Sequence, residues 1–165
     1  MAPPRDEPPI RVTTDFVVLT SSLATRLLPT LHEIDADALG EPWRSEQWLV
    51  DLPEKWVHSR VATVDGRPVG FIVASRKAHA VHVHRIAVAA SWRDRGIGAA
   101  LLRAAAASAR SRGAARLTLK VARSNARALH LYHTLGFTHE RSEEDNACLI
   151  APVATLLATG AARRL

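Results

Sequence analysis

Cysteine is almost absent from this chain of 165 residues: Cys148 is the only one. A single cysteine excludes an intrachain disulfide and a cysteine cluster for zinc, and the sequence predicts no metal site. Cys148 lies in an apolar segment without a nearby activating base, which disfavours a covalent enzyme intermediate. No apolar run reaches the roughly 18 residues of a membrane span, and no signal-peptide core is present. We therefore expect a cytoplasmic protein without a membrane partner.

A concentrated basic patch is also missing, although the formal net charge is +6 and the isoelectric point is about 10.6. The basic side chains are mostly arginines, and they are scattered from Arg5 to Arg164. A nucleic-acid-binding protein would need a compact basic face. We therefore expect no nucleic-acid partner.

The length and the 47% hydrophobic content fit one domain with its own core, and no internal repeat is present. Residues 1–13 are rich in proline and polar side chains, so we expect a disordered tail followed by a single domain over residues 14–165. A monomer or a homodimer is expected.

The hydrophobic pattern predicts alternating strands and helices. A hairpin is expected around Asp65 and Gly66, Ser21 or Ser22 is expected to cap the first helix, and Pro29 to kink or split it. Strands are predicted at residues 16–19, 57–64, 68–74, 80–88, 117–121, 137–141 and 146–151, and helices at residues 21–36, 45–48, 99–112 and 125–135. The strand, helix and strand over residues 80–121 form a βαβ unit, which requires a partly parallel sheet.

The segment from Arg93 to Gly98 reads Arg-Asp-Arg-Gly-Ile-Gly and connects a predicted strand to a predicted helix. A glycine-rich turn at a helix start presents unpaired N–H groups and the positive end of the helix dipole, which suit a pyrophosphate. The third glycine of a dinucleotide fingerprint and the Gly-Lys-Ser/Thr ending of a P-loop are both missing.

A second motif follows about thirty residues later, where Asn125 to Phe137 reads NARALHLYHTLGF. Together the two segments resemble the signature blocks of the GNAT superfamily of acyl-CoA-dependent N-acetyltransferases. The resemblance covers residues from about 14 to 152. It implies an α/β (mixed α+β) fold, with a central mixed, partly parallel sheet of six to seven strands flanked by helices.

The resemblance also implies acetyl-CoA as co-substrate and transfer of its acetyl group to a primary amine by direct attack, through a tetrahedral intermediate. Tyr132 would protonate the departing thiolate, and an N–H of Ala87 or Val88 would stabilise the carbonyl oxygen. The residues expected to contact coenzyme A are Ile86, Ala87, Val88, Arg93, Asp94, Arg95, Gly96, Ile97, Gly98, Ala99, Asn125, Ala128 and Tyr132.

Proton removal from the amine points to His82 and His84, which lie two residues apart on a predicted strand and should share a face with Ile86. Proximity and burial would keep both imidazoles neutral. The His-x-His pattern resembles arylalkylamine N-acetyltransferases, which relay protons through paired strand histidines. Packing of both histidines as structural residues is the alternative, with Glu33, Glu46 or an ordered water as the base.

The amine acceptor is less constrained. Glu33, Trp43 and Trp48 lie where this family shapes its acceptor pocket, and an aromatic, acidic lining suits a small cationic amine. Tryptophans at this spacing also pack helices onto sheets. A protein N-terminus or lysine is an alternative acceptor, and a non-catalytic module that senses acetyl-CoA is an alternative of another class. The length of the acyl group is open.

Overall fold

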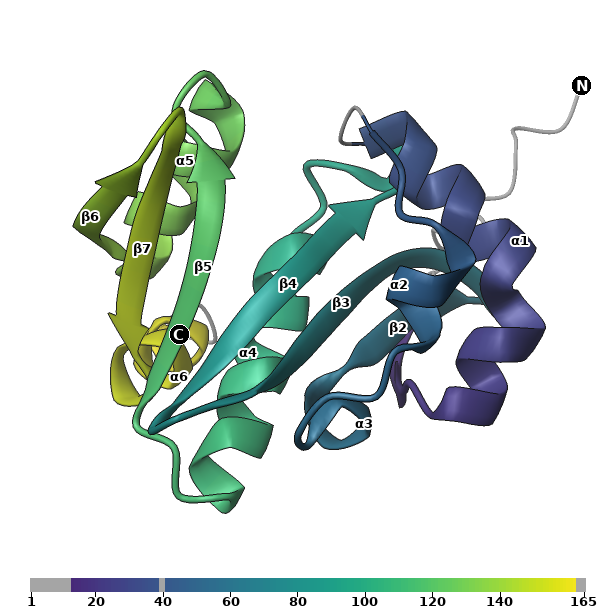
Figure 1. Ribbon diagram of the computed structural model, residues 1–165, viewed down its shortest axis with the longest axis horizontal. Coiled ribbons are helices and arrows are strands. Elements are labelled where there is room, and N and C mark those ends of the chain that lie inside the picture. The colour runs from purple at the N-terminus through teal and green to yellow at the C-terminus, as the bar shows by residue number, and fades with distance from the viewer. Residues whose placement is uncertain (1–12, 39–40, 163–165) are drawn as a thin grey trace, which may run out of the picture.

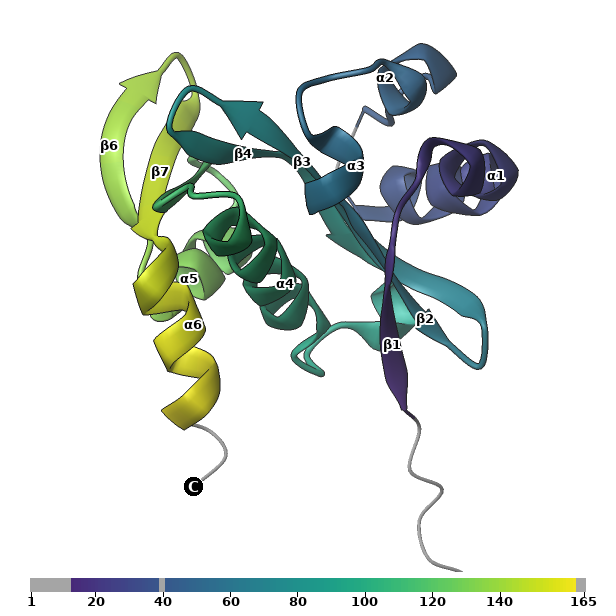
Figure 2. The same ribbon diagram turned by 90° about the horizontal axis from the view of Figure 1, so that it is seen from below.

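The computed structural model describes residues 13–38 and 41–162. They form one mixed sheet of seven strands in the order β1-β2-β3-β4-β5-β7-β6, with helices on both faces (Figures 1 and 2). The predicted tail at residues 1–13 lies outside the described residues, except for Thr13. The strands are β1 (Thr14–Val18), β2 (Arg60–Val64), β3 (Arg67–Lys77), β4 (Ala80–Val88), β5 (Arg116–Ala122), β6 (Thr138–Glu143) and β7 (Asn146–Pro152). The helices are α1 (Ser21–Ala38), α2 (Ser45–Leu49), α3 (Lys55–His58), α4 (Ile97–Ser111), α5 (Ala126–Leu135) and α6 (Val153–Ala162), with a 3-10 turn at Ala90–Trp92.

Two hydrophobic cores hold the layers together. One core packs α4, α5 and α6 against the sheet through Leu101, Leu102 and Leu117, all fully buried. The other packs α1 and α2 against the opposite face, where Leu31 of α1 and Phe71 of β3 are buried. Burial on both faces explains why the central strands read as nearly continuous apolar runs.

The first part of the chain differs in detail from the prediction. Helix α1 continues through Pro29, and its cap is Thr20, whose Oγ1 accepts from the N–H of Leu23 at 3.2 Å. The predicted strand at residues 57–64 begins only at Arg60, because residues 55–58 form α3. Buried side-chain hydrogen bonds of Lys55 and His58 stabilise α3, and such tertiary contacts override a local β pattern.

The arrangement of β4 determines where the site lies. β3 pairs antiparallel with β4 along its whole length, whereas β5 pairs parallel with β4 only from Ala80 to Val83. Beyond Val83 the two strands diverge, as Figure 1 shows at their upper ends. Among the described residues, no strand pairs with the edge of β4 from His84 to Val88 on the side of β5. The backbone N–H groups on this edge are therefore available to a ligand.

Candidate active site

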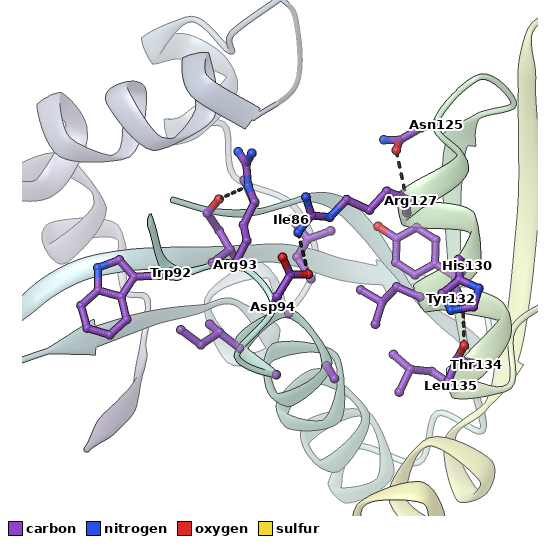
Figure 3. A pocket seen from close by; sticks show the side chains of 18 residues that line it. Ile86, Trp92, Arg93, Asp94, Asn125, Arg127, His130, Tyr132, Thr134 and Leu135 are labelled. Atoms are coloured by element: carbon purple, nitrogen blue, oxygen red, sulfur yellow. Dashed lines mark hydrogen bonds and ion pairs between the residues drawn. The ribbon is translucent and has the colours of Figure 1, made fainter. Parts of the chain in front are cut away.

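A cavity of about 520 Å³ lies where β4 and β5 diverge, between the start of α4 and one face of α5 (Figure 3). Twelve of the thirteen residues predicted to contact coenzyme A line it, and Arg95 does not. The lining residues are Ile86, Ala87, Val88, Trp92, Arg93, Asp94, Gly96, Ile97, Gly98, Ala99, Asn125, Arg127, Ala128, His130, Leu131, Tyr132, Thr134 and Leu135.

Gly96 forms the base of an anion cradle at the start of α4. It is the N-cap residue, with a φ of 79° and no side-chain cap, so the first N–H groups of the helix are open to a ligand. A Cβ at this position would meet no atom within 4 Å, which shows that space for a ligand lies beside the backbone. Free N–H groups, the helix dipole and this space together fit a pyrophosphate.

The arginines of the same loop have different positions. Arg93 donates from Nε to the carbonyl oxygen of Val88 at 3.0 Å, and its Nη2 lies 3.7 Å from Asp37 of α1. It therefore ties the end of β4 to α1 while lining the cavity. The guanidinium of Arg95 instead stacks over the ring of Trp92, 4.6 Å from its centroid. Trp92 lines the cavity and Arg95 does not.

Helix α5 contributes Asn125 and Tyr132. Asn125 caps this helix, because its Oδ1 accepts from the N–H of Ala128 at 3.2 Å; its amide N–H groups remain available to donate to a ligand. Tyr132 is 7% exposed, and burial raises the pKa of its hydroxyl to about 12. No hydrogen bond joins this hydroxyl to another described residue, and Figure 3 shows its ring directed into the cavity. The side chain is thus a protonated phenol at neutral pH.

His82 and His84 form a pair, with ring centroids 5.0 Å apart. His82 Nδ1 lies 2.8 Å from Thr118 Oγ1 on β5, and His84 Nε2 lies 2.6 Å from Ser75 Oγ on β3. Burial lowers the pKa of His82 to about 4, assisted by His84 and nearby lysines. Burial also lowers the pKa of His84, assisted by Lys55 and Lys77. Both imidazoles are therefore neutral at pH 7 and able to accept a proton.

The expectation that this pair shares a face with Ile86 is wrong. A β-bulge opposite Val73 and Ala74 inserts His84 as an extra residue into β4, and a bulge reverses the alternation beyond it. Ile86 consequently packs on the α4 side, whereas Arg85 turns to the α1 side and bonds Asp35 at 2.6 Å. The histidines do not line the cavity themselves. They lie on the opposite face of the sheet, at the point where β4 leaves β5.

Of the three residues predicted for the acceptor, Trp43 and Trp48 are in contact, with ring centroids 5.3 Å apart, and Glu33 is separate from them. Trp48 is 0% exposed and packs against Phe71, 4.6 Å between ring centroids, so it is a core residue. Glu33 is exposed on α1 and lines neither the cavity described above nor the second cavity described next. Trp43 borders a second cavity, of about 550 Å³, whose other lining residues are Glu41, Pro42, Arg44, Gln47 and Arg85.

Sequence reasoning missed several residues of the main cavity. Arg127, His130 and Thr134 line it from α5, and their spacing of three and four residues places them on one helical face. That spacing was the available signal. Asp35 lies in the region expected to give the acceptor pocket its acidic lining; it is fully buried and accepts from Arg85 and from the N–H of Trp43 at 2.7 Å. Its burial and its ion pair with Arg85 have no signal in the local sequence.

Two further observations concern the described residues only. None of their helices has the length and apolar character needed to cross a membrane. They also contain no cluster of three or more His, Cys, Asp or Glu side chains that could hold a metal ion.

Several solved structures share this fold. The ribosomal-protein-S18-alanine N-acetyltransferase of Escherichia coli has a TM-score of 0.73 at 22% identity, over 86% of this chain and 94% of that one. The PaiA N-acetyltransferase of Thermoplasma acidophilum, solved in complex with coenzyme A, has a TM-score of 0.69 at 17% identity, over 85% and 99%. Nourseothricin acetyltransferase is 33% identical, with a TM-score of 0.51, over 58% and 64%.

The sequence itself gives the family. Residues 27–137 match the model of the acetyltransferase (GNAT) family, a match that includes the glycine-rich loop, the diverging strands and α5. The predicted mixed sheet with flanking helices is confirmed. This chain therefore belongs to the GNAT family of acetyltransferases, enzymes that use acetyl-CoA.

Proposed function

We propose that this enzyme acetylates the primary amine of a small molecule, with acetyl-CoA bound in the cavity between β4, α4 and α5. The observation that carries the proposal is the meeting of an open anion cradle at Gly96, an unpaired strand edge and the buried hydroxyl of Tyr132 in one cavity. In acetyl-CoA the pyrophosphate would bind the cradle, the amide groups of the arm would pair with the strand edge, and the thioester sulfur would lie near the Tyr132 hydroxyl.

The backbone of β4 supplies the donor for the thioester carbonyl. The N–H of Ala89 donates to Val69 on β3 at 2.8 Å. Because backbone groups alternate along an extended strand, the N–H of Ala87 also faces β3, and those of Ile86 and Val88 face the unpaired edge. Of the two donors expected from the sequence, Val88 is therefore the one in position to stabilise negative charge on the carbonyl oxygen.

Two proton transfers are needed: the histidines take the proton of the amine, and Tyr132 protonates the thiolate. The amine attacks as its free base, and its proton leaves toward His82 and His84, which are neutral at pH 7. A pKa of about 4 for His82 suits transient relay to water better than storage of the proton. On the other side, the Tyr132 hydroxyl gives its proton to the departing thiolate. This use of paired histidines is the one expected from the resemblance to arylalkylamine N-acetyltransferases.

Support for a small acceptor is the 33% identity to nourseothricin acetyltransferase over 58% of this chain. The second candidate is a protein N-terminus or lysine, favoured by the fold similarity over 86% of the chain to the acetyltransferase of ribosomal protein S18. A panel of small amines and short peptides, incubated with acetyl-CoA and followed by thiol release and mass spectrometry, separates the two. Acetylated peptides with inert small amines would establish the second candidate.

Coenzyme placement has its own test. We expect acetyl-CoA to raise the thermal midpoint of the protein and Gly96→Glu to abolish the rise, because a carboxylate would occupy the cradle. The matched control is Gly113→Glu at the other end of α4, since Gly113 has a similar φ of 74° and is equally open. Equal stabilisation of both folded variants would contradict the placement.

A further inference from the structure

An ion pair crosses the mouth of the coenzyme cavity. Arg127, in the first turn of α5, lies with its Nη2 2.7 Å from Oδ1 of Asp94, in the loop that precedes α4. Both residues line the cavity, and Figure 3 shows the guanidinium reaching across it to the carboxylate. The pair thus connects two walls of a site that must admit a large anion.

Asp94 places a negative charge where an anionic ligand is expected to bind. It puts a carboxylate two residues before Gly96, beside N–H groups that suit an anion. It also has a φ of 61°, which an aspartate tolerates better than most residues do. A negative charge here repels an anionic ligand unless a cation neutralises it, and Arg127 is that cation.

The ion pair between Arg127 and Asp94 is weak enough to be broken by a ligand. The side chain of Arg127 is 62% exposed and that of Asp94 is 83% exposed, and ion pairs so accessible to water are weak. A pyrophosphate as a whole, or a terminal phosphate by itself, carries more negative charge than a single carboxylate, and a phosphate accepts two parallel hydrogen bonds from a guanidinium. A phosphate in the cavity therefore competes well for Arg127.

We propose that Arg127 is a phosphate-binding residue for the coenzyme, and that Asp94 holds it across the cavity until the coenzyme arrives. On binding, the guanidinium leaves Asp94 for a phosphate oxygen, and the carboxylate turns out to water. Asp94 thereby lowers the affinity for coenzyme A, and Arg127 raises it. This inference rests on the proposed placement of the coenzyme in this cavity.

The experiment measures the Kd of coenzyme A by isothermal titration calorimetry at low salt, for wild type, Arg127→Gln, Asp94→Asn and the control Arg110→Gln. Arg110 is an exposed arginine in the last turn of α4, outside the cavity. We expect Arg127→Gln to raise the Kd about tenfold, and to flatten its dependence on salt, because one charge-assisted contact is lost. We expect Asp94→Asn to lower the Kd about twofold, and Arg110→Gln to leave it nearly unchanged.

The two variants test the two parts of the proposal separately. A rise below threefold for Arg127→Gln overturns the phosphate-binding role, and a weaker affinity in Asp94→Asn overturns the holding role. Repeating the titration with dephospho-CoA locates the phosphate: a loss that persists assigns the pyrophosphate, and one that disappears assigns the ribose phosphate. Failure of the wild type to bind coenzyme A would instead contradict the proposed placement itself. Thermal unfolding without ligand shows whether each variant is folded.

Discussion

Two groups of histidines, buried His58 and the half-buried pair His82 and His84, have similar partners and different surroundings. His58 is 0% exposed between α3 and α4, and both of its ring nitrogens are bonded: Nδ1 lies 2.7 Å from Ser108 Oγ and Nε2 lies 2.8 Å from Glu54. His82 and His84 are also bonded to hydroxyl groups, of Thr118 and Ser75. Each of these two rings, however, has only one nitrogen with a partner among the described residues.

Burial and access separate a structural histidine from one that can exchange a proton with a ligand. His58 is fully buried and both of its ring nitrogens are bonded to protein groups, so it links two elements and is out of reach of water or an amine. His82 and His84 lie where β4 and β5 separate, so their remaining nitrogens can meet water or an amine. We therefore expect His58 to contribute to stability and the pair to proton transfer, and the following changes test that division.

The largest effect is expected from replacing both His82 and His84 by Gln. Glutamine keeps polarity and approximate size but accepts no proton, so the turnover at pH 7 should fall about 100-fold or more, within the usual range for general base catalysis. The loss should shrink above pH 9, where more of the amine is already deprotonated. The pH profile of kcat/KM is the measurement. An unchanged profile would make both histidines structural, like His58.

Tyr132→Phe removes only a hydroxyl, and this change should lower kcat by about 10-fold to 100-fold. The Kd of coenzyme A should stay nearly constant, because the ring keeps its edge contact with Phe137 at 5.6 Å. Stability should also persist, since no described residue bonds the hydroxyl. Steady-state kinetics and calorimetry measure the two parts. Wild-type kcat would show that the thiolate takes its proton elsewhere.

His58→Gln should produce the opposite result. It breaks a buried network in which Ser108 and Glu54 both lose a partner, so the free energy of unfolding should fall by about 1–3 kcal/mol. The kcat per folded molecule should not change, because α3 lies outside the cavity. Urea denaturation and active-site titration separate the two quantities. A loss of kcat without a loss of stability would break the comparison.

The sequence predicted the composition of the cavity far better than the faces of β4. Glycine spacing and the Asn125 to Tyr132 segment mark local features, a helix start and a helical face, which follow from neighbouring residues. The bulge at His84 depends instead on how β3 meets β4 across the sheet, and the helix at Lys55 depends on carbonyl oxygens of Trp48 and Val50. Such long-range contacts have no signature in a local pattern.

The smallest expected effect is on the pH dependence of stability. The folded pKa of His82 is about 4, below its ordinary value of 6.5. Between these values the unfolded chain binds more protons than the folded one, so the free energy of unfolding falls as the pH drops from 6.5 toward 4. Above pH 6.5 this histidine adds no pH dependence. Burial also lowers the pKa of His58, but its bond to Glu54 opposes the shift.

His82→Gln should therefore flatten the acid side of the stability curve more than His58→Gln does. Urea denaturation at intervals from pH 4.5 to 7.5 gives the slope for each variant, and the difference from wild type isolates the contribution of one imidazole. A slope in His82→Gln equal to that of wild type would show that the folded pKa of His82 is close to its ordinary value of 6.5. Part of the His82 side chains would then be protonated near neutral pH, and only the neutral fraction could accept the proton of the amine.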